Sequence, residues 1–160
     1  MTLTVDALSP DEPIIIMSRI FDAARETVWE AFTKPEHVAR WYGGHGFTNP
    51  VCEMDVRPGG HWHHVMRTPD GNEFETNFIF VEVVKPEKLS WQDIDHGKRP
   101  PGGHPSCLIT VTLEDLGART KWRMVARFSS IAERDLAQRT GFTHVLAEGT
   151  ERFNEVAKSI

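Results

Sequence analysis

Residues 61–91 read HWHHVMRTPDGNEFETNFIFVEVVKPEKLSW, and this stretch decides the fold. Apolar and polar side chains alternate along it, which is the two-residue period of β-strands. Two turn sequences interrupt the alternation, PDGN at 69–72 and KPEK at 85–88. Because strands joined by such short turns pair antiparallel, the stretch predicts three adjacent antiparallel strands, at 61–68, 73–84 and 89–94.

The sequence on both sides extends this sheet. Further strands are expected at 14–21, 48–56, 106–114 and 120–128. After the first of them, apolar side chains recur every three or four residues, which is the period of a helix face. This pattern predicts two short helices, one at 25–33 and one that starts at Pro35 and ends before the glycines at 43–46.

The C-terminal part of the chain predicts a long amphipathic helix. Ser130 and Glu133 have the spacing of a capping box, and Gly141 interrupts the helix that starts there. From Phe142 to Ala157 the apolar positions form one helical stripe, which has to be buried against the sheet. The predicted class is therefore α+β, with seven strands, two short helices between strands one and two, and a long C-terminal helix.

The bulk composition fits one domain. The chain has 160 residues, 39% hydrophobic and 26% charged, which suits a single core. We expect a flexible lead-in at 1–13 and one domain at 14–160. The net charge of −5 disfavours nucleic acids and anionic membranes as partners. Because no secretory signal or membrane-spanning run is recognisable, we expect a cytoplasmic protein with Cys52 and Cys107 as reduced thiols.

Five motifs carry a family resemblance. They are RIFDAARETVWEAFTKPEHVARWYGGHGFT (19–48), CEMDVRPGGHWHHVMRTPDG (52–71), VEVVKPEKLSW (81–91), VTLEDLGARTKWRMVARF (111–128) and TGFTHVLAEGTERF (140–153). In this order they resemble the START-like (SRPBCC) superfamily, in its branch named for homologues of the activator of the heat-shock protein 90 ATPase. The resemblance implies a helix-grip fold, in which a curved seven-stranded antiparallel sheet wraps the last helix around a cavity. It leaves function open, because the superfamily includes lipid carriers, polyketide cyclases, hormone receptors and co-chaperone domains.

Strand alternation predicts which side chains face this cavity. Most of them are aromatic or methionine, with a few polar groups, which is typical of a small-molecule site. On the opposite face of the longest strand, Ile79, Val81 and Val83 would form an apolar surface for a homodimer or a protein partner. The predicted ligand-binding residues are Trp41, Trp62, His64, Met66, Phe78, Phe80, Trp91, Asp93, Trp122, Met124, Phe142, Val145 and Leu146.

His64 and Asp93 are the candidate catalytic residues. Both fall on the inward face of their strands, and a buried carboxylate is costly unless it is paired. An imidazole partner could make the pair a general base or a ligand contact. The alternative is that Asp93 is solvated at its strand end and that His64 bonds a backbone carbonyl.

The histidines also suggest a metal, although we predict none. His61 and His63 lie two residues apart on one strand face, and a third ligand would have to come from His45, His96 or His104. No CxxC or HExxH pattern accompanies them, so exposed histidines on the outer face are the preferred interpretation. The loop at 95–105, rich in glycine and proline, is a candidate gate of the cavity.

Three functions remain open at this stage, and no cofactor is expected for any of them. The preferred one is a non-enzymatic binding or carrier domain for a small hydrophobic molecule. The second is a cyclase or hydrolase that uses His64 and Asp93. The third is a co-chaperone-like protein-interaction module, which the family name suggests.

Overall fold

A computed structural model of the chain describes residues 3–6, 8–94 and 105–160. Within them it contains one eight-stranded antiparallel sheet and four helices. The predicted α+β helix-grip fold is confirmed. The sheet has one strand more than predicted: β1 lies inside the expected lead-in and pairs with β2. The elements are β1 (Thr4–Val5), β2 (Ile14–Phe21), α1 (Arg25–Thr33), α2 (Pro35–Trp41), β3 (Thr48–Met54), β4 (His61–Arg67), β5 (Glu73–Val84), β6 (Lys88–Asp93), β7 (Cys107–Asp115), β8 (Thr120–Phe128), α3 (Ile131–Arg139) and α4 (Phe142–Ser159).

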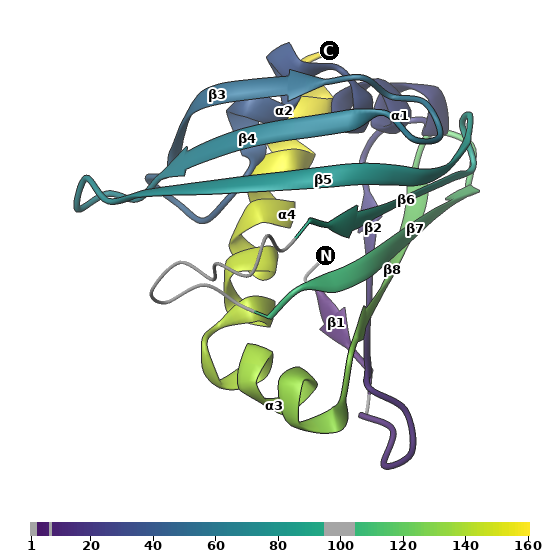
Figure 1. The fold of residues 1–160 in the computed structure, drawn as a ribbon. Coiled ribbons are helices and arrows are strands. Elements are labelled where there is room, and N and C mark those ends of the chain that lie inside the picture. Colours follow the sequence, from purple (N-terminus) through teal and green to yellow (C-terminus); the bar gives the residue numbers. More distant parts are fainter. Residues whose placement is uncertain (1–2, 7, 95–104) are drawn as a thin grey trace.

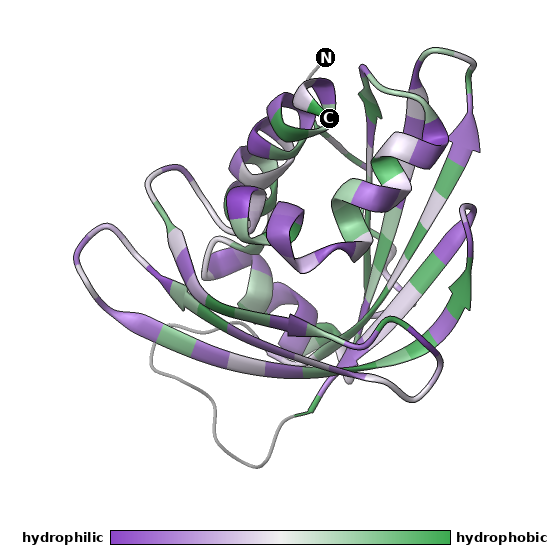
Figure 2. Cartoon of the chain, turned by 90° about the horizontal axis from the view of Figure 1, so that it is seen from above, coloured by the Kyte–Doolittle hydropathy of each residue, from purple (hydrophilic) through white to green (hydrophobic). Residues whose placement is uncertain are grey.

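The sheet is a meander closed by the first long strand. Its order is β1-β2-β8-β7-β6-β5-β4-β3, so β3 to β8 are neighbours in both sequence and space, and β2 pairs with β8. Figure 1 shows the sheet curving around α4, with α1 and α2 across the C-terminal end of that helix. Seen from above in Figure 2, the strands bend around the helices. One concave face of the sheet therefore has to bury the apolar stripe of α4.

Two local signals set the position of α4. Gly141 has a φ of 90° at the residue before the helix, a conformation that favours glycine, and it separates α3 from α4. The Ser130 Oγ accepts a hydrogen bond from the Glu133 backbone N–H at 3.1 Å, which confirms the predicted start of α3. Phe153 and Val156 are buried on the inner side of α4.

None of the described helices is long and apolar enough to cross a membrane.

The last two strands build the wall of the core as alternation predicts. Every second side chain of β7 and β8 is buried, because the concave face of each strand meets the helices. Fully burying a large apolar side chain contributes roughly 1.5–3 kcal/mol each, so these strands anchor the domain. The buried apolar residues are Cys107, Ile109, Val111 and Leu113 on β7, and Trp122, Met124, Ala126 and Phe128 on β8.

A bulge in β5 corrects the predicted outer surface. The pairing runs from Phe80 opposite Trp91 to Glu82 opposite Ser90, so Val81 is an extra residue. One inserted residue exchanges the two faces of a strand. Val83 therefore packs against the core, while Val81 remains 52% exposed. The predicted continuous apolar surface of Ile79, Val81 and Val83 is wrong.

Candidate functional site

A cavity of about 590 Å³ lies on the concave side of the sheet. A cavity of this volume is in the range of small-molecule sites. All of the predicted lining residues except His64 and Phe80 line it. The other lining residues were not among the predicted ligand-binding residues. They are Phe32, Tyr42, Gly43, Phe47, Thr68, Phe74, Glu75, Thr76, Asn77, Ile94, Ser106, Ile109, Thr140, Gly141, Gly149, Thr150 and Phe153.

The two exceptions lie on the predicted face but behind other side chains. Phe80 is fully buried, and its ring stacks on that of Trp62 with centroids 5.9 Å apart. His64 is also fully buried, with the Tyr42 ring centroid 4.1 Å from its own. Since Trp62 and Tyr42 both line the cavity, they stand between these residues and the space. Alternation predicts the face of a strand but not the depth of a side chain.

The His64 imidazole makes a hydrogen bond through each of its ring nitrogens. Its Nδ1 accepts from the Trp62 indole N–H at 3.2 Å, so this nitrogen carries no proton. Its Nε2 lies 2.7 Å from the Asn49 Oδ1, and an amide oxygen only accepts, so Nε2 donates. Burial, with a smaller contribution from the nearby charge of His63, lowers the pKa of His64 to about 4. His64 is thus a neutral Nε2–H imidazole.

The structure does not bring His64 and Asp93 together as a catalytic pair. Both imidazole nitrogens are engaged elsewhere, and strand β5 lies between the two residues. In that sheet His64 is opposite Thr76, whereas Asp93 is opposite Phe78. Asp93 does line the cavity, as predicted, but His64 is a buried structural group that supports Trp62.

Tyr42, Thr76 and Asp93 form a polar patch in the cavity wall. All three residues line the cavity. Burial raises the pKa of the Tyr42 phenol well above its ordinary value, and the negative charge of Asp93 raises it further. The Thr76 hydroxyl acts in the opposite direction through a hydrogen bond with the phenol. The phenol therefore stays protonated and can donate or accept a hydrogen bond.

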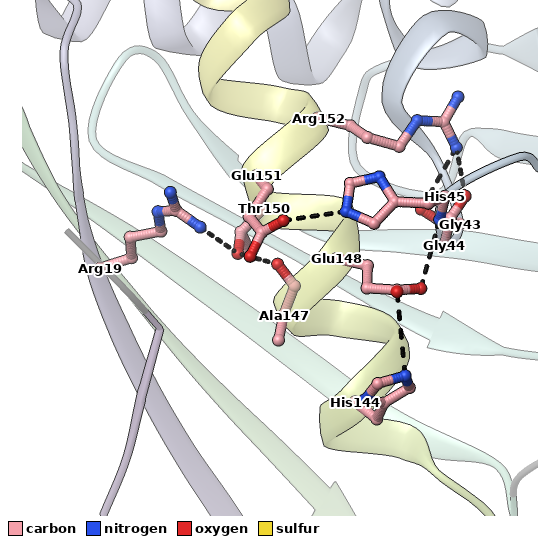
Figure 3. Close-up of polar contacts among 10 residues, drawn as sticks. All are labelled: Arg19, Gly43, Gly44, His45, His144, Ala147, Glu148, Thr150, Glu151 and Arg152. Atoms are coloured by element: carbon pink, nitrogen blue, oxygen red, sulfur yellow. Dashed lines mark hydrogen bonds and ion pairs between the residues drawn. The ribbon is translucent and has the colours of Figure 1, made fainter.

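Tyr42 begins a segment, residues 42–47, that we call the strap. Arg152 of α4 holds its first half by donating from Nη1 to the carbonyl oxygens of Tyr42, Gly43 and Gly44 at 2.8–3.3 Å. The Arg152 Nη2 also donates to the Arg40 carbonyl at 2.8 Å. The Arg40 and Tyr42 carbonyls lie at the C-terminal end of helix α2, where a cation is favourable. Figure 3 shows the guanidinium reaching from α4 to the strap.

The second half of the strap is held by two glutamates of α4. The Glu148 Oε1 accepts from the His45 backbone N–H at 3.2 Å, and the Glu151 Oε2 lies 2.8 Å from the His45 Nε2 (Figure 3). Gly44 fits here without a side chain, because a Cβ would lie 2.6 Å from the Glu148 Oε1. The strap thus holds Tyr42 and Phe47 against the cavity.

None of the other histidines that the structure describes lines the cavity. On the outer face of β4, the His61 Nε2 is 2.9 Å from the Asn77 Oδ1, and the His63 Nε2 is 3.0 Å from the Glu75 Oε2. In the part of the chain that the structure describes, no three histidine, cysteine or acidic side chains form a metal-binding group. His96, His104 and nearly all of the candidate gate loop lie outside the described residues.

The model of one protein family matches most of the chain. Its description is Activator of Hsp90 ATPase homolog 1-like protein, and it covers residues 22–154. The chain belongs to this family. The match spans α1 to α4, including the strap and the cavity wall described above, and it agrees with the START-like resemblance of the motifs. No curated protein matches the chain in sequence.

Solved structures share the fold of this family member over nearly its whole length. Protein NE0264 from Nitrosomonas europaea has a TM-score of 0.83 at 23% identity, covering 95% of this chain and 97% of that one. An Arthrobacter aurescens protein has a TM-score of 0.84 at 23% identity, covering 98% and 92%. A Rhodobacter sphaeroides protein has a TM-score of 0.86 at 17% identity and covers 100% of both chains. At these identities the likeness establishes the fold alone.

Proposed function

We propose that this domain is a non-enzymatic binding or carrier protein for a small, mainly apolar molecule held in the internal cavity. The observation that carries the proposal is the cavity of about 590 Å³ and its aromatic wall, which includes Trp41, Trp62, Phe78 and Trp122. Apolar surface removed from water contributes roughly 25 cal/mol per Å², so a ligand of matching shape gains most of its affinity from this wall. The polar patch then supplies orientation.

The enzyme alternative loses its proposed base. It required His64 to take a proton in the cavity, yet both ring nitrogens are bonded and its pKa is about 4. Asp93 stays in the cavity wall, where a carboxylate oxygen can accept a hydrogen bond from a ligand. Asp93 therefore enters the proposal as a ligand contact.

Two further expectations belong to the proposal. Cys52 and Cys107 are free thiols, which favours a reducing compartment such as the cytoplasm. A chaperone ATPase as partner, which the family description suggests, and a homodimer stay predictions. Neither needs the cavity to be accessible, so a test of the cavity separates them from carriage.

The test is a fluorescence titration with the neutral apolar probe N-phenyl-1-naphthylamine. The wild-type domain should bind about one probe per chain. Leu146→Trp, which fills the cavity from α4, should weaken binding at least about 10-fold. Val81→Trp is the matched control, because Val81 is 52% exposed on the outer face, and it should bind like the wild type. Equal loss or equal binding in both variants would place the probe outside the cavity and refute the proposal.

A further inference from the structure

The indole N–H of Trp122 is a buried donor without an acceptor from the protein. Trp122 is 2% exposed and lines the cavity, and no described residue accepts a hydrogen bond from its Nε1. Two other tryptophans of the same cavity behave differently. The Trp41 Nε1 donates to the Ala31 carbonyl at 2.8 Å, and the Trp62 Nε1 donates to the His64 Nδ1. Trp122 is therefore an exception within its own site.

A second donor lies beside it. Arg19 of β2 is directly opposite Trp122 in the β2–β8 pairing, and residues opposite each other in an antiparallel pair share a face. Figure 3 shows the Arg19 side chain directed toward α4, where its Nη1 donates to the Thr150 Oγ1 at 3.0 Å. Its Nε is also buried without an acceptor among the described residues. Thr150 lines the cavity, whereas Arg19 lines a separate open pocket together with His45 and Glu151.

Buried N–H groups are almost always hydrogen-bonded, since an unmade bond costs free energy. A donor without a protein acceptor calls for water or for a ligand atom. The polar patch of Asp93 lies elsewhere on the cavity wall. Trp122 is opposite Leu113, near the C-terminal end of β7. Asp93 ends β6, next to the N-terminal end of β7. The Trp122 donor and the polar patch of Asp93 therefore lie in different parts of the cavity wall.

We propose that the molecule bound in this cavity carries an oxygen acceptor, a carbonyl or a carboxylate, that accepts the hydrogen bond of the Trp122 indole N–H. The inference rests on the proposed function and narrows its ligand class from apolar molecules in general to apolar molecules with an oxygen at one end. Arg19, which is opposite Trp122 in the sheet but does not line the cavity, adds a positive charge on the same face and favours a partial or full negative charge on this oxygen. The rest of the ligand lies against the aromatic wall.

Three probes with one skeleton test the proposal. They are 2-acetylnaphthalene, its hydrocarbon counterpart 2-isopropenylnaphthalene, and 2-naphthoate. Isothermal titration calorimetry should show the ketone, the carboxylate or both binding about 10-fold more tightly than the hydrocarbon. A preference for the ketone assigns a neutral carbonyl and one for naphthoate assigns a carboxylate. Trp122→Phe should remove the preference while leaving hydrocarbon binding within about 3-fold of the wild type.

A spectroscopic readout makes the test independent of the variant's folding. In the ¹H–¹⁵N spectrum of the wild-type protein, the Trp122 indole proton should move downfield with the oxygen-bearing probe and stay nearly unchanged with the hydrocarbon. Trp41 is the internal control, since its N–H already has an acceptor. If the hydrocarbon binds as tightly as both oxygen-bearing probes and the Trp122 resonance does not respond, the inference is wrong although the cavity binds. If none of the three probes binds, the proposed function itself fails.

Discussion

Lowering the pH from 8 to 5 should destabilise the protein by about 2 kcal/mol through His64 alone. Burial lowers the pKa of this imidazole from an ordinary 6.5 to about 4 in the folded state. Between these two values the unfolded chain binds a proton that the folded chain does not. The stabilising contribution of the neutral imidazole is therefore complete above pH 6.5, falls as the pH drops and levels off below about 4. The full difference corresponds to roughly 3 kcal/mol.

Urea denaturation of the wild type and of His64→Gln at pH 8, 7, 6 and 5 isolates this contribution. The variant should be less stable at pH 8, by about 2 kcal/mol, because Asn49 and Trp62 lose hydrogen bonds. Its stability should then fall less than that of the wild type as the pH drops, so the two curves converge. His144→Gln is the matched control, since that side chain is 77% exposed, and its curve should parallel the wild type.

Long-range ¹H–¹⁵N spectra of the histidine rings check the same reasoning directly. His64 should appear as the neutral Nε2–H tautomer, because its Nδ1 accepts from Trp62, and it should titrate near pH 4. A titration midpoint near 6.5, an Nδ1–H tautomer, or parallel stability curves for His64→Gln and the wild type would each refute the account of this residue.

Two further predictions concern the strap. In a thermal unfolding assay, Gly43→Ala should destabilise the fold by about 2–4 kcal/mol, because φ is +91° and the new Cβ would lie 2.6 Å from the Phe47 ring. Gly71→Ala is the control, since Gly71 has the same φ and no atom within 4 Å of a new Cβ. It should cost only about 1 kcal/mol. Arg152→Met should cost about 2 kcal/mol through its lost carbonyl bonds, against under about 0.5 kcal/mol for the exposed Arg127→Met in urea denaturation. Equal losses within either pair would show that the strap contacts contribute nothing.

The fold is well predicted by sequence because its strands follow one another through short turns. In such a meander, alternation along β4, β6, β7 and β8 leads directly to the inward faces, and Trp62, Trp91 and Trp122 are found there. The prediction of inward and outward faces fails along β5, where the bulge at Val81 inserts one residue into the alternation. No distinctive residue type marks this bulge in the sequence. Nor does a two-residue strand such as β1 have enough length to show a period.

The site is predicted less completely than the fold because lining a cavity depends on depth and on loops. His64 has the inward parity but is covered by Tyr42, and its Asn49 partner comes from β3 through a contact that no spacing in the sequence reveals. Phe47 lines the cavity from the strap, which Arg152 holds against α4. The periodicity of apolar residues describes one helix or strand at a time, whereas these contacts join elements that are far apart in the chain.

Native mass spectrometry of the domain purified from its own cells tests the central claim most directly. The account predicts a peak heavier than the polypeptide by one stoichiometric small molecule, which denaturation releases and which Leu146→Trp fails to retain. An oxygen-bearing, mainly apolar molecule is the expected product of the release. A domain that is empty under gentle ionisation, and that no apolar probe stabilises against heating, would contradict the claim that the cavity carries a ligand.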